Sequence, residues 1–270
     1  MHLQPESRVV TLPEAALLGL IQGLAEWLPV SSEGVVTAVY SLVFGADLPD
    51  AVNFSLWLHL GTALSALAAF RSDVWDVIRE IARRPTSPSP VTAYLILATL
   101  SSAPLGFLLL IGLFEFSEIV GAIAMAVVGL LMLITGAVLI KSKSSGTRTR
   151  DDVRWPDAIL TGIAQGLAAL PGLSRSGLTV SALLWRGVDR REALTLSFIL
   201  SIPASLGAGL YAAISAGYYA SPEATVALVV SALTGFLTIR ALMSVAQRLN
   251  FGWFVLVLGA GIIAGATLIW

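Results

Sequence analysis

Six stretches of the chain run for about 16–23 residues without a charged side chain. A helix needs about 20 apolar residues to cross the hydrocarbon of a bilayer, so each stretch is long enough, or nearly so, to span a membrane. The sequence therefore predicts an all-α, multi-pass membrane protein. The six predicted spans cover residues 51–70, 91–113, 119–140, 193–214, 224–239 and 251–270.

The composition supports this prediction and excludes several other classes of protein. Charged residues make up 12% of the chain, about half of the usual share for a soluble domain, and 56% of the residues are hydrophobic. A net charge of −1 gives no basic excess for a nucleic acid to bind. The absence of cysteine excludes disulfides and thiolate sites. Residues 1–10 lack a basic segment followed by an apolar run, so we expect no cleaved signal peptide.

Two further apolar segments, 12–45 and 158–185, are broken midway by Pro, Gly and Ser. The breaks read LPVSSEG at 28–34 and LPGLSRSG at 170–177. Non-helical backbone at membrane depth is tolerated only inside protein or beside a water-filled cavity. We therefore predict two re-entrant helix–loop–helix hairpins. A kinked spanning helix is the alternative for each segment.

The loops between the predicted spans alternate in charge. Basic loops usually face the cytoplasm. The alternation keeps its register if all six spans cross and each broken segment returns to its own side, the first entering from outside and the second from inside. Arg and Lys mark loops 71–90, 141–157, 186–191 and 240–248, whereas loops 46–50, 114–118 and 215–223 carry acids and no base.

The two broken segments also resemble each other. At an offset of 143 positions, QGLAEWLPVSSEG (22–34) aligns with QGLAALPGLSRSG (165–177). Three predicted spans follow each copy, so the copies would lie upside down relative to each other. We expect one domain, 1–270, made of inverted repeats at about 12–140 and 158–270. Such repeats build a substrate site where their broken helices meet.

Three ionisable residues fall within the broken segments, at membrane depth: Glu26, Glu33 and Arg175. Each costs about 2.5–3.5 kcal/mol on insertion scales, and such residues usually serve a function. A structural ion pair is the alternative, but two acids and an arginine beside paired serines favour a polar site.

These residue types suit phosphate chemistry. Arg175 can grip phosphate oxygens with two hydrogen bonds. Glu26 could bind a divalent cation or act as a general base. His59 lies in an apolar span; we favour a neutral hydrogen-bonding role, with acid or base work if it faces Ser32. The candidate nucleophiles are Ser31 and Ser32, and the candidate phosphate donors are Gly172, Ser174, Ser176 and Gly177.

The motifs resemble a known family. Gln22–Glu26 (Q-x-x-x-E) followed by PVSS, together with PG-x-SRSG at 171–177, is similar to the undecaprenyl-diphosphatase, or bacitracin-resistance, family. The similarity runs from about Leu12 to the C-terminus. It implies a plasma-membrane hydrolase that removes the terminal phosphate of a polyprenyl diphosphate and recycles the lipid carrier, using Mg²⁺ or Ca²⁺.

The resemblance also implies roles for individual residues. Gln22 and Glu26 fill the acidic, metal-binding motif, and Ser32 matches the proposed nucleophile. The family reads SSTGH where this chain has Glu33 and Val35 in place of Thr and His, a variant closer to the archaeal branch, whose carrier would be dolichol-like. Glu33, Glu26 and His59 are therefore the candidates for acid/base work. The family's serine pair falls on Ser31 and Ser32, and its phosphate-binding loop on Ser174, Arg175 and Ser176. With the donors named above, the expected phosphate-binding residues are Ser31, Gly172, Ser174, Arg175, Ser176 and Gly177.

Two other functions remain open at this point. A flippase for prenyl phosphate suits inverted repeats and the missing histidine. An anion channel or scaffold is a weaker alternative. In each case we expect the bilayer as partner and no nucleic acid, and a homodimer is compatible with the sequence.

Overall fold

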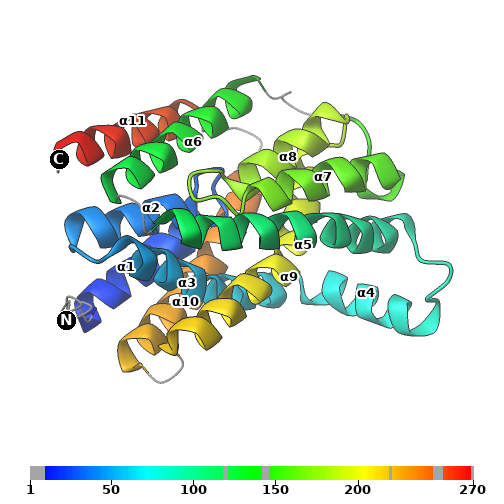
Figure 1. Cartoon of the computed structure of the whole chain (residues 1–270). Helices are drawn as coiled ribbons and strands as arrows, with labels where there is room; N and C mark the ends of the chain where they lie inside the picture. Colours follow the sequence, from blue (N-terminus) through cyan, green and yellow to red (C-terminus); the bar gives the residue numbers. More distant parts are fainter. Residues whose placement is uncertain (1–9, 118–120, 142–145, 219–220, 246–251, 269–270) are drawn as a thin grey trace.

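The computed structural model describes residues 10–117, 121–141, 146–218, 221–245 and 252–268, and the regular elements of this part of the chain are helices (Figure 1). The all-α prediction is therefore confirmed for the described residues. Most of the signal-peptide prediction lies outside them. The elements are α1 (Leu12–Ala25), α2 (Ser32–Ala38) with the π-helix η1 (Val39–Val43), α3 (Leu48–Ala69), α4 (Arg71–Arg83), α5 (Pro90–Ser117), α6 (Gly121–Lys141), the 3₁₀ turn η2 (Arg150–Asp152), α7 (Trp155–Leu167), α8 (Arg175–Trp185), α9 (Arg190–Ala216), α10 (Pro222–Val245) and α11 (Gly252–Leu268).

Four helices of the described chain are long and apolar enough to cross a membrane. They comprise α3, the Pro90–Leu109 part of α5, α9 and the Pro222–Ser244 part of α10, and they match four of the six predicted spans. The other two predicted spans fall on α6 and α11, whose described apolar parts, Met125–Lys141 and Val255–Thr267, are shorter. Parts of those two predictions lie outside the described residues.

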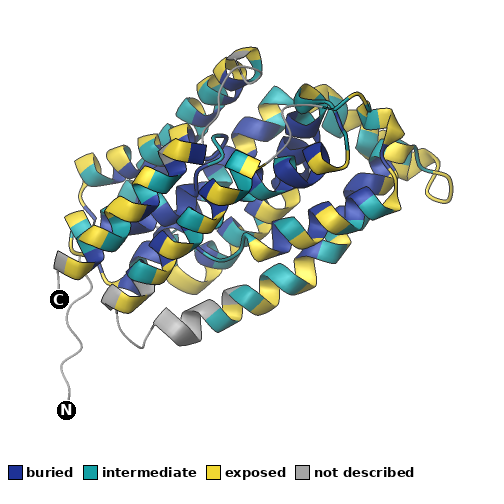
Figure 2. Cartoon of the chain, turned by 90° about the horizontal axis from the view of Figure 1, so that it is seen from above, coloured by how far each residue is buried: buried dark blue, intermediate teal, exposed yellow. Residues whose placement is uncertain are grey.

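Large apolar side chains cover the outside of the bundle. Leu100, Leu237 and Val257 are 65%, 67% and 69% exposed, and the outward faces of the helices are largely exposed in Figure 2. A water-soluble protein would not leave so many large apolar side chains in solvent. The exposed surface is therefore suited to lipid.

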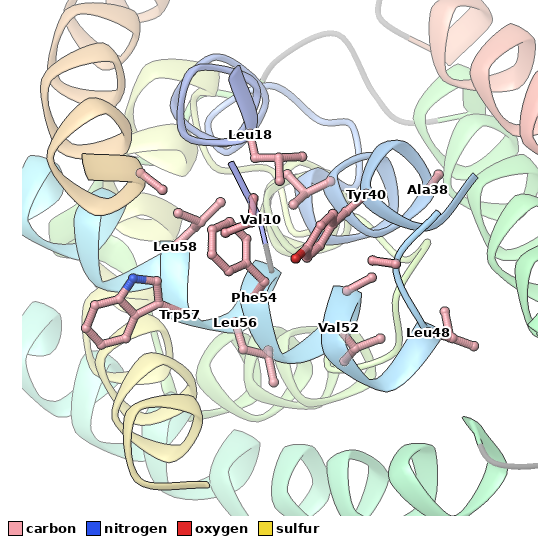
Figure 3. Close-up of a cluster of buried hydrophobic side chains, with 14 of the residues drawn as sticks. Val10, Leu18, Ala38, Tyr40, Leu48, Val52, Phe54, Leu56, Trp57 and Leu58 are labelled. Carbon is pink, nitrogen blue, oxygen red and sulfur yellow. The ribbon is translucent and has the colours of Figure 1, made fainter. Parts of the chain in front are cut away.

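Aromatic side chains fill the interior on either side of α3. Tyr40 and Phe54 pack with their ring centroids 5.3 Å apart in the cluster between α1, α2 and α3 (Figure 3). The indole of Trp57 donates to the carbonyl of Ala224 in α10, at 2.8 Å. A second cluster surrounds Phe198 of α9, whose ring meets Trp27 edge-on at 5.2 Å. These contacts hold α3, α9 and α10 around the broken segments.

Loops of like charge gather at the same end of the bundle. Arg150 forms ion pairs with Asp73 (2.6 Å) and Glu192 (3.7 Å), which joins two of the predicted basic loops and the residue that directly follows a third, 186–191. At the other end, the Tyr218 hydroxyl donates to the carbonyl of Asp50 at 3.3 Å and so joins two of the predicted acidic loops. This grouping agrees with the charge alternation of the sequence.

The arms of the two broken segments pack against helices from the opposite half of the chain. α1 lies along α10, and α7 lies along α5. Glycines make these approaches close: a Cβ at Gly19 would lie 2.3 Å from the Ala227 carbonyl oxygen, and one at Gly162 would lie 2.6 Å from that of Ala98. The breaks between the arms are thereby held deep within the bundle.

Candidate active site

The two breaks end in the same helix cap. Ser31 precedes α2 and its hydroxyl accepts from the Gly34 N–H at 3.1 Å, while Ser174 precedes α8 and accepts from the Gly177 N–H, also at 3.1 Å. A serine cap satisfies one of the N–H groups that a helix start leaves without a partner. The matching S-x-x-G spacing thus starts a helix at the same point in each break. We call residues 26–34 the first tip and residues 169–177 the second tip.

The two tips bind each other directly. The N–H of Gly172 donates to the Ser31 hydroxyl at 2.8 Å, and the Ser176 hydroxyl donates to the carbonyl of Leu28 at 2.8 Å. Gly172 has a φ of +104°, a conformation that favours glycine. The expectation that the two broken segments meet is confirmed.

Glu26 is the most highly connected side chain between the tips. Its Oε1 atom pairs with the Arg175 guanidinium, and its Oε2 atom accepts from the Ser32 hydroxyl at 2.6 Å. The amide of Gln22 donates to the same Oε2 atom at 2.9 Å. With a side chain only 2% exposed, the carboxylate is buried, and its charge is balanced by Arg175.

His59 approaches this carboxylate from α3. Its Nδ1 atom lies 2.8 Å from the carbonyl oxygen of Ser55, and its Nε2 atom lies 3.5 Å from Oε2 of Glu26. A carbonyl oxygen can only accept, so the ring carries a proton on Nδ1. His59 therefore does face the group that binds Ser32.

Glu33 lies nearby in a very different environment. The residue is 7% exposed, yet its Oε1 atom has no hydrogen-bond partner among the described residues. Gln22 likewise has a buried Oε1 atom without a partner in this part of the structure. Such atoms are uncommon in folded proteins and call for a ligand, a water or a proton.

Two adjoining cavities open at the tips. A small polar cavity of about 30 Å³ is lined by Glu26, Ser32, Glu33, His59 and Arg175, together with the serines of both tips. A larger cavity of about 470 Å³ lies between α3, α5, α7 and α9 and has mostly apolar walls. Glu33, His59, Ala168 and Arg175 line both. A ligand with a charged head and an apolar tail fits this arrangement.

The structure brings most of the predicted site residues together, with one difference of detail. The Gly177 N–H donates to Ser174 in the cap of α8, and the Gly172 N–H donates to Ser31 of the first tip, so both groups already have a partner within the protein. The residues that gather at the small cavity are Glu26, Ser31, Ser32, Glu33, His59, Ser174, Arg175 and Ser176, and Gln22 contacts Glu26 behind them.

Some supporting residues were not predicted from the sequence. The Arg175 guanidinium lies 6.0 Å from the centroid of the Trp27 ring, and its Nη1 atom is 3.5 Å from the carbonyl of Ser197. From α6, the Thr135 hydroxyl accepts from the N–H of Ser174 at 3.2 Å. Trp27 adjoins Glu26 in sequence and could have been suspected, whereas Ser197 and Thr135 carry no local signal.

The chain is similar to known proteins of one family over nearly its whole length. The sequence profile described as "Bacitracin resistance protein BacA" matches residues 15–263. A protein of Methanococcoides burtonii named undecaprenyl-diphosphatase is 38% identical over 258 residues, covering 93% of this chain and 97% of the relative. A Haloarcula marismortui protein of the same name is 40% identical over 260 residues, covering 93% and 96%. The chain belongs to the bacitracin-resistance protein BacA family.

Proposed function

We propose that this protein is an integral-membrane phosphatase that hydrolyses a long-chain polyprenyl diphosphate, of undecaprenyl or dolichyl type, to the monophosphate and inorganic phosphate. The observation that carries the proposal is the hydrogen bond from the Ser32 hydroxyl to Glu26, beside Arg175, in a polar cavity that adjoins a large apolar one. The names of the two relatives point to the same substrate class.

Each residue of the site has a defined task in this reaction. Arg175 binds the terminal phosphate, because its planar guanidinium matches two phosphate oxygens. Ser32 attacks the terminal phosphorus, and Glu26, 2.6 Å away, accepts the hydroxyl proton as general base. The His59 ring covers the other side of the Glu26 carboxylate, with its Nε2 atom 3.5 Å from Oε2. The prenyl chain extends from the large cavity toward lipid.

Substrate binding has to open the pair between Arg175 and Glu26. Both side chains are largely buried, at 13% and 2% exposure, so their attraction is only weakly screened by solvent. A phosphate that takes over the guanidinium leaves Glu26 without its cation. Its Oε2 atom still accepts from the Ser32 hydroxyl, so Glu26 stays in place as the general base.

A divalent cation, Mg²⁺ or Ca²⁺, is part of the proposal. Gln22 and Glu26 would hold it: the unpartnered Oε1 atom of Gln22 is a hard oxygen donor next to a carboxylate. Within the described residues, no three His, Asp or Glu side chains form a metal cluster, so diphosphate oxygens and water would complete the shell. Such an ion neutralises the charge of the diphosphate. Chelation should abolish phosphate release, and either ion should restore it.

The finer topology is also proposed. The two broken segments are re-entrant hairpins in inverted repeats, in a multi-pass protein of the cell membrane with the Arg-rich end in the cytoplasm. The pairing of α1 with α10 and of α7 with α5 supports this, as do two Gly-x-x-x-Gly pairs at the 143-position offset, Gly19–Gly23 and Gly162–Gly166. Cysteine labelling at Ser72 and Ser221 from each side of the membrane tests it.

Cross-linking in native membranes tests for a homodimer.

Phosphate release from a long-chain prenyl diphosphate by purified protein tests the function. We expect release by the wild type and none by Ser32→Ala. Ser244 is exposed and lines neither cavity, so Ser244→Ala should release phosphate like the wild type. Equal rates for wild type and Ser32→Ala would contradict the assigned nucleophile. Movement of labelled prenyl phosphate between leaflets without hydrolysis would instead indicate a flippase.

A further inference from the structure

Two buried carboxyl groups of the site stand in opposite environments. Glu26 contacts Arg175, Gln22 and Ser32, and His59 lies close by. The buried Oε1 atom of Glu33, seven residues later in the chain, has no hydrogen-bond partner in the described structure. The same side chain lines both the polar and the apolar cavity.

This contrast decides which of the two groups is ionised. A buried carboxylate without donors is strongly disfavoured, and such a group takes up a proton instead. Glu26 already supplies one negative charge, which disfavours a second one nearby. The other titratable groups that line the cavities with Glu33 are His59 of α3, Arg175 of α8 and Tyr211 of α9, and Arg175 is paired with Glu26. Glu33 is therefore the neutral carboxylic acid of the pair.

We propose that Glu33 is the general acid that protonates the leaving prenyl phosphate. The inference rests on the proposed function. Ser32 and Arg175 place the terminal phosphorus in the small cavity, and the prenyl chain lies in the large one, so the bridging oxygen lies where the cavities meet. Glu33 lines both cavities and so borders that junction. Paired carboxyl groups in contrasting environments commonly divide acid and base work in this way.

The reaction balances in two steps. First, the Ser32 oxygen bonds to the terminal phosphorus, the bond from that phosphorus to the bridging oxygen breaks, Glu26 takes the serine proton, and Glu33 gives its proton to the bridging oxygen. Second, a water oxygen bonds to the phosphorus of the phosphoserine, and the bond from that phosphorus to the Ser32 oxygen breaks, which releases inorganic phosphate. Glu33, now a carboxylate, takes a proton from the water, and Glu26 returns its proton to the Ser32 oxygen. Both carboxyl groups end as they began, and one water molecule is consumed.

The protonation state can be measured without turnover. Infrared spectra of the purified protein at neutral pH should contain the C=O stretching band of a buried protonated carboxyl, which a carboxylate does not give. Glu33→Gln should remove this band, and Glu223→Gln, at the acidic end of the bundle, should not. A band that persists in Glu33→Gln would overturn the assignment.

Activity tests the role in the reaction. Glu33→Gln should lower kcat on a prenyl diphosphate by about 10²–10⁴-fold, the usual contribution of a general acid. On dinitrophenyl phosphate, whose leaving group needs no proton, it should slow the single-turnover release of dinitrophenolate, which reports the first step alone, by less than about tenfold. Steady-state turnover should fall on both substrates, because Glu33 also activates the water of the second step. Ser32→Ala should abolish both reactions. Glu223→Gln should change neither.

Other outcomes have distinct meanings. Equal losses in the single-turnover release of the two leaving groups would show that Glu33 is not a leaving-group acid, and an unchanged prenyl rate would show that it has no role. A Glu33→Gln variant whose activity returns at higher Mg²⁺ would assign Glu33 to the cation and overturn the proposal. No phosphate release from the prenyl diphosphate by the wild type would contradict the proposed function itself, whatever the infrared band of Glu33 shows.

Discussion

The first and second tips share a backbone and differ in charge. Ser31 and Ser174 cap their helices with the same hydrogen bond, to Gly34 and Gly177, at the same 143-position offset. At that offset, however, Ala169 matches Glu26, and Arg175 matches Ser32. The common caps set where each helix starts, and the side chains that differ place a carboxylate and a hydroxyl beside a guanidinium. The similar parts of the tips therefore build the site, and the differing parts give it chemistry.

The largest effect should come from removing the cation of the second tip. Arg175→Ala should lower phosphate release by about 10³-fold or more, because no other side chain of the small cavity replaces the guanidinium. Arg175→Lys should recover only part of the rate, since an ammonium cannot form the paired hydrogen bonds. Arg240→Ala, an exposed arginine over Phe236, is the control. Activity of Arg175→Ala within tenfold of wild type would show that the second tip does not supply the phosphate-binding group.

The free energy of unfolding should depend on whether Glu26 and Arg175 are paired more than on the presence of either residue alone. Arg175→Met leaves Glu26 buried without its cation and should destabilise the protein by about 3–5 kcal/mol. The double variant Glu26→Gln with Arg175→Met should recover most of this loss while remaining inactive. Denaturant unfolding in detergent measures both. A double variant as unstable as the sum of its single changes would show that the pair is not coupled.

The sequence could predict which side chains meet at the site better than it could predict the residues that support them. Apolar stretches, loop charges and the repeated S-x-x-G breaks were enough to place Glu26, Ser32 and Arg175 together, since each follows from burial or local chain geometry. The contacts of Thr135 and Ser197, and the hydrogen bond from Gly172 to Ser31, depend on which parts of the chain pack against the tips. That information is set by contacts between residues far apart in sequence, so no local pattern carries it.

Replacing Gly172 in the second tip should destabilise the protein more than replacing Gly217, another glycine with a positive φ. A Cβ at Gly172 would lie 2.3 Å from the carbonyl oxygen of Val128, so Gly172→Ala adds an overlap with α6 to the backbone strain. Gly217, at the end of α9 with a φ of +68°, has nothing within 4 Å of such a Cβ. Gly172→Ala should cost about 2–4 kcal/mol more than Gly217→Ala in the same unfolding assay. Equal costs would show that α6 does not hold the second tip closely.

The smallest expected effect separates the two caps. Loss of a serine cap costs about 1 kcal/mol, and Ser174→Ala should cost about this much. Ser31→Ala should cost about 1 kcal/mol more, because the Ser31 hydroxyl also accepts the Gly172 N–H at 2.8 Å and its loss leaves a second buried donor without a partner. Both are read as the free energy of unfolding in detergent. If Ser174→Ala proved the more damaging, the contact from Ser31 to Gly172 would not be what joins the tips, and the site would depend on the ion pair instead.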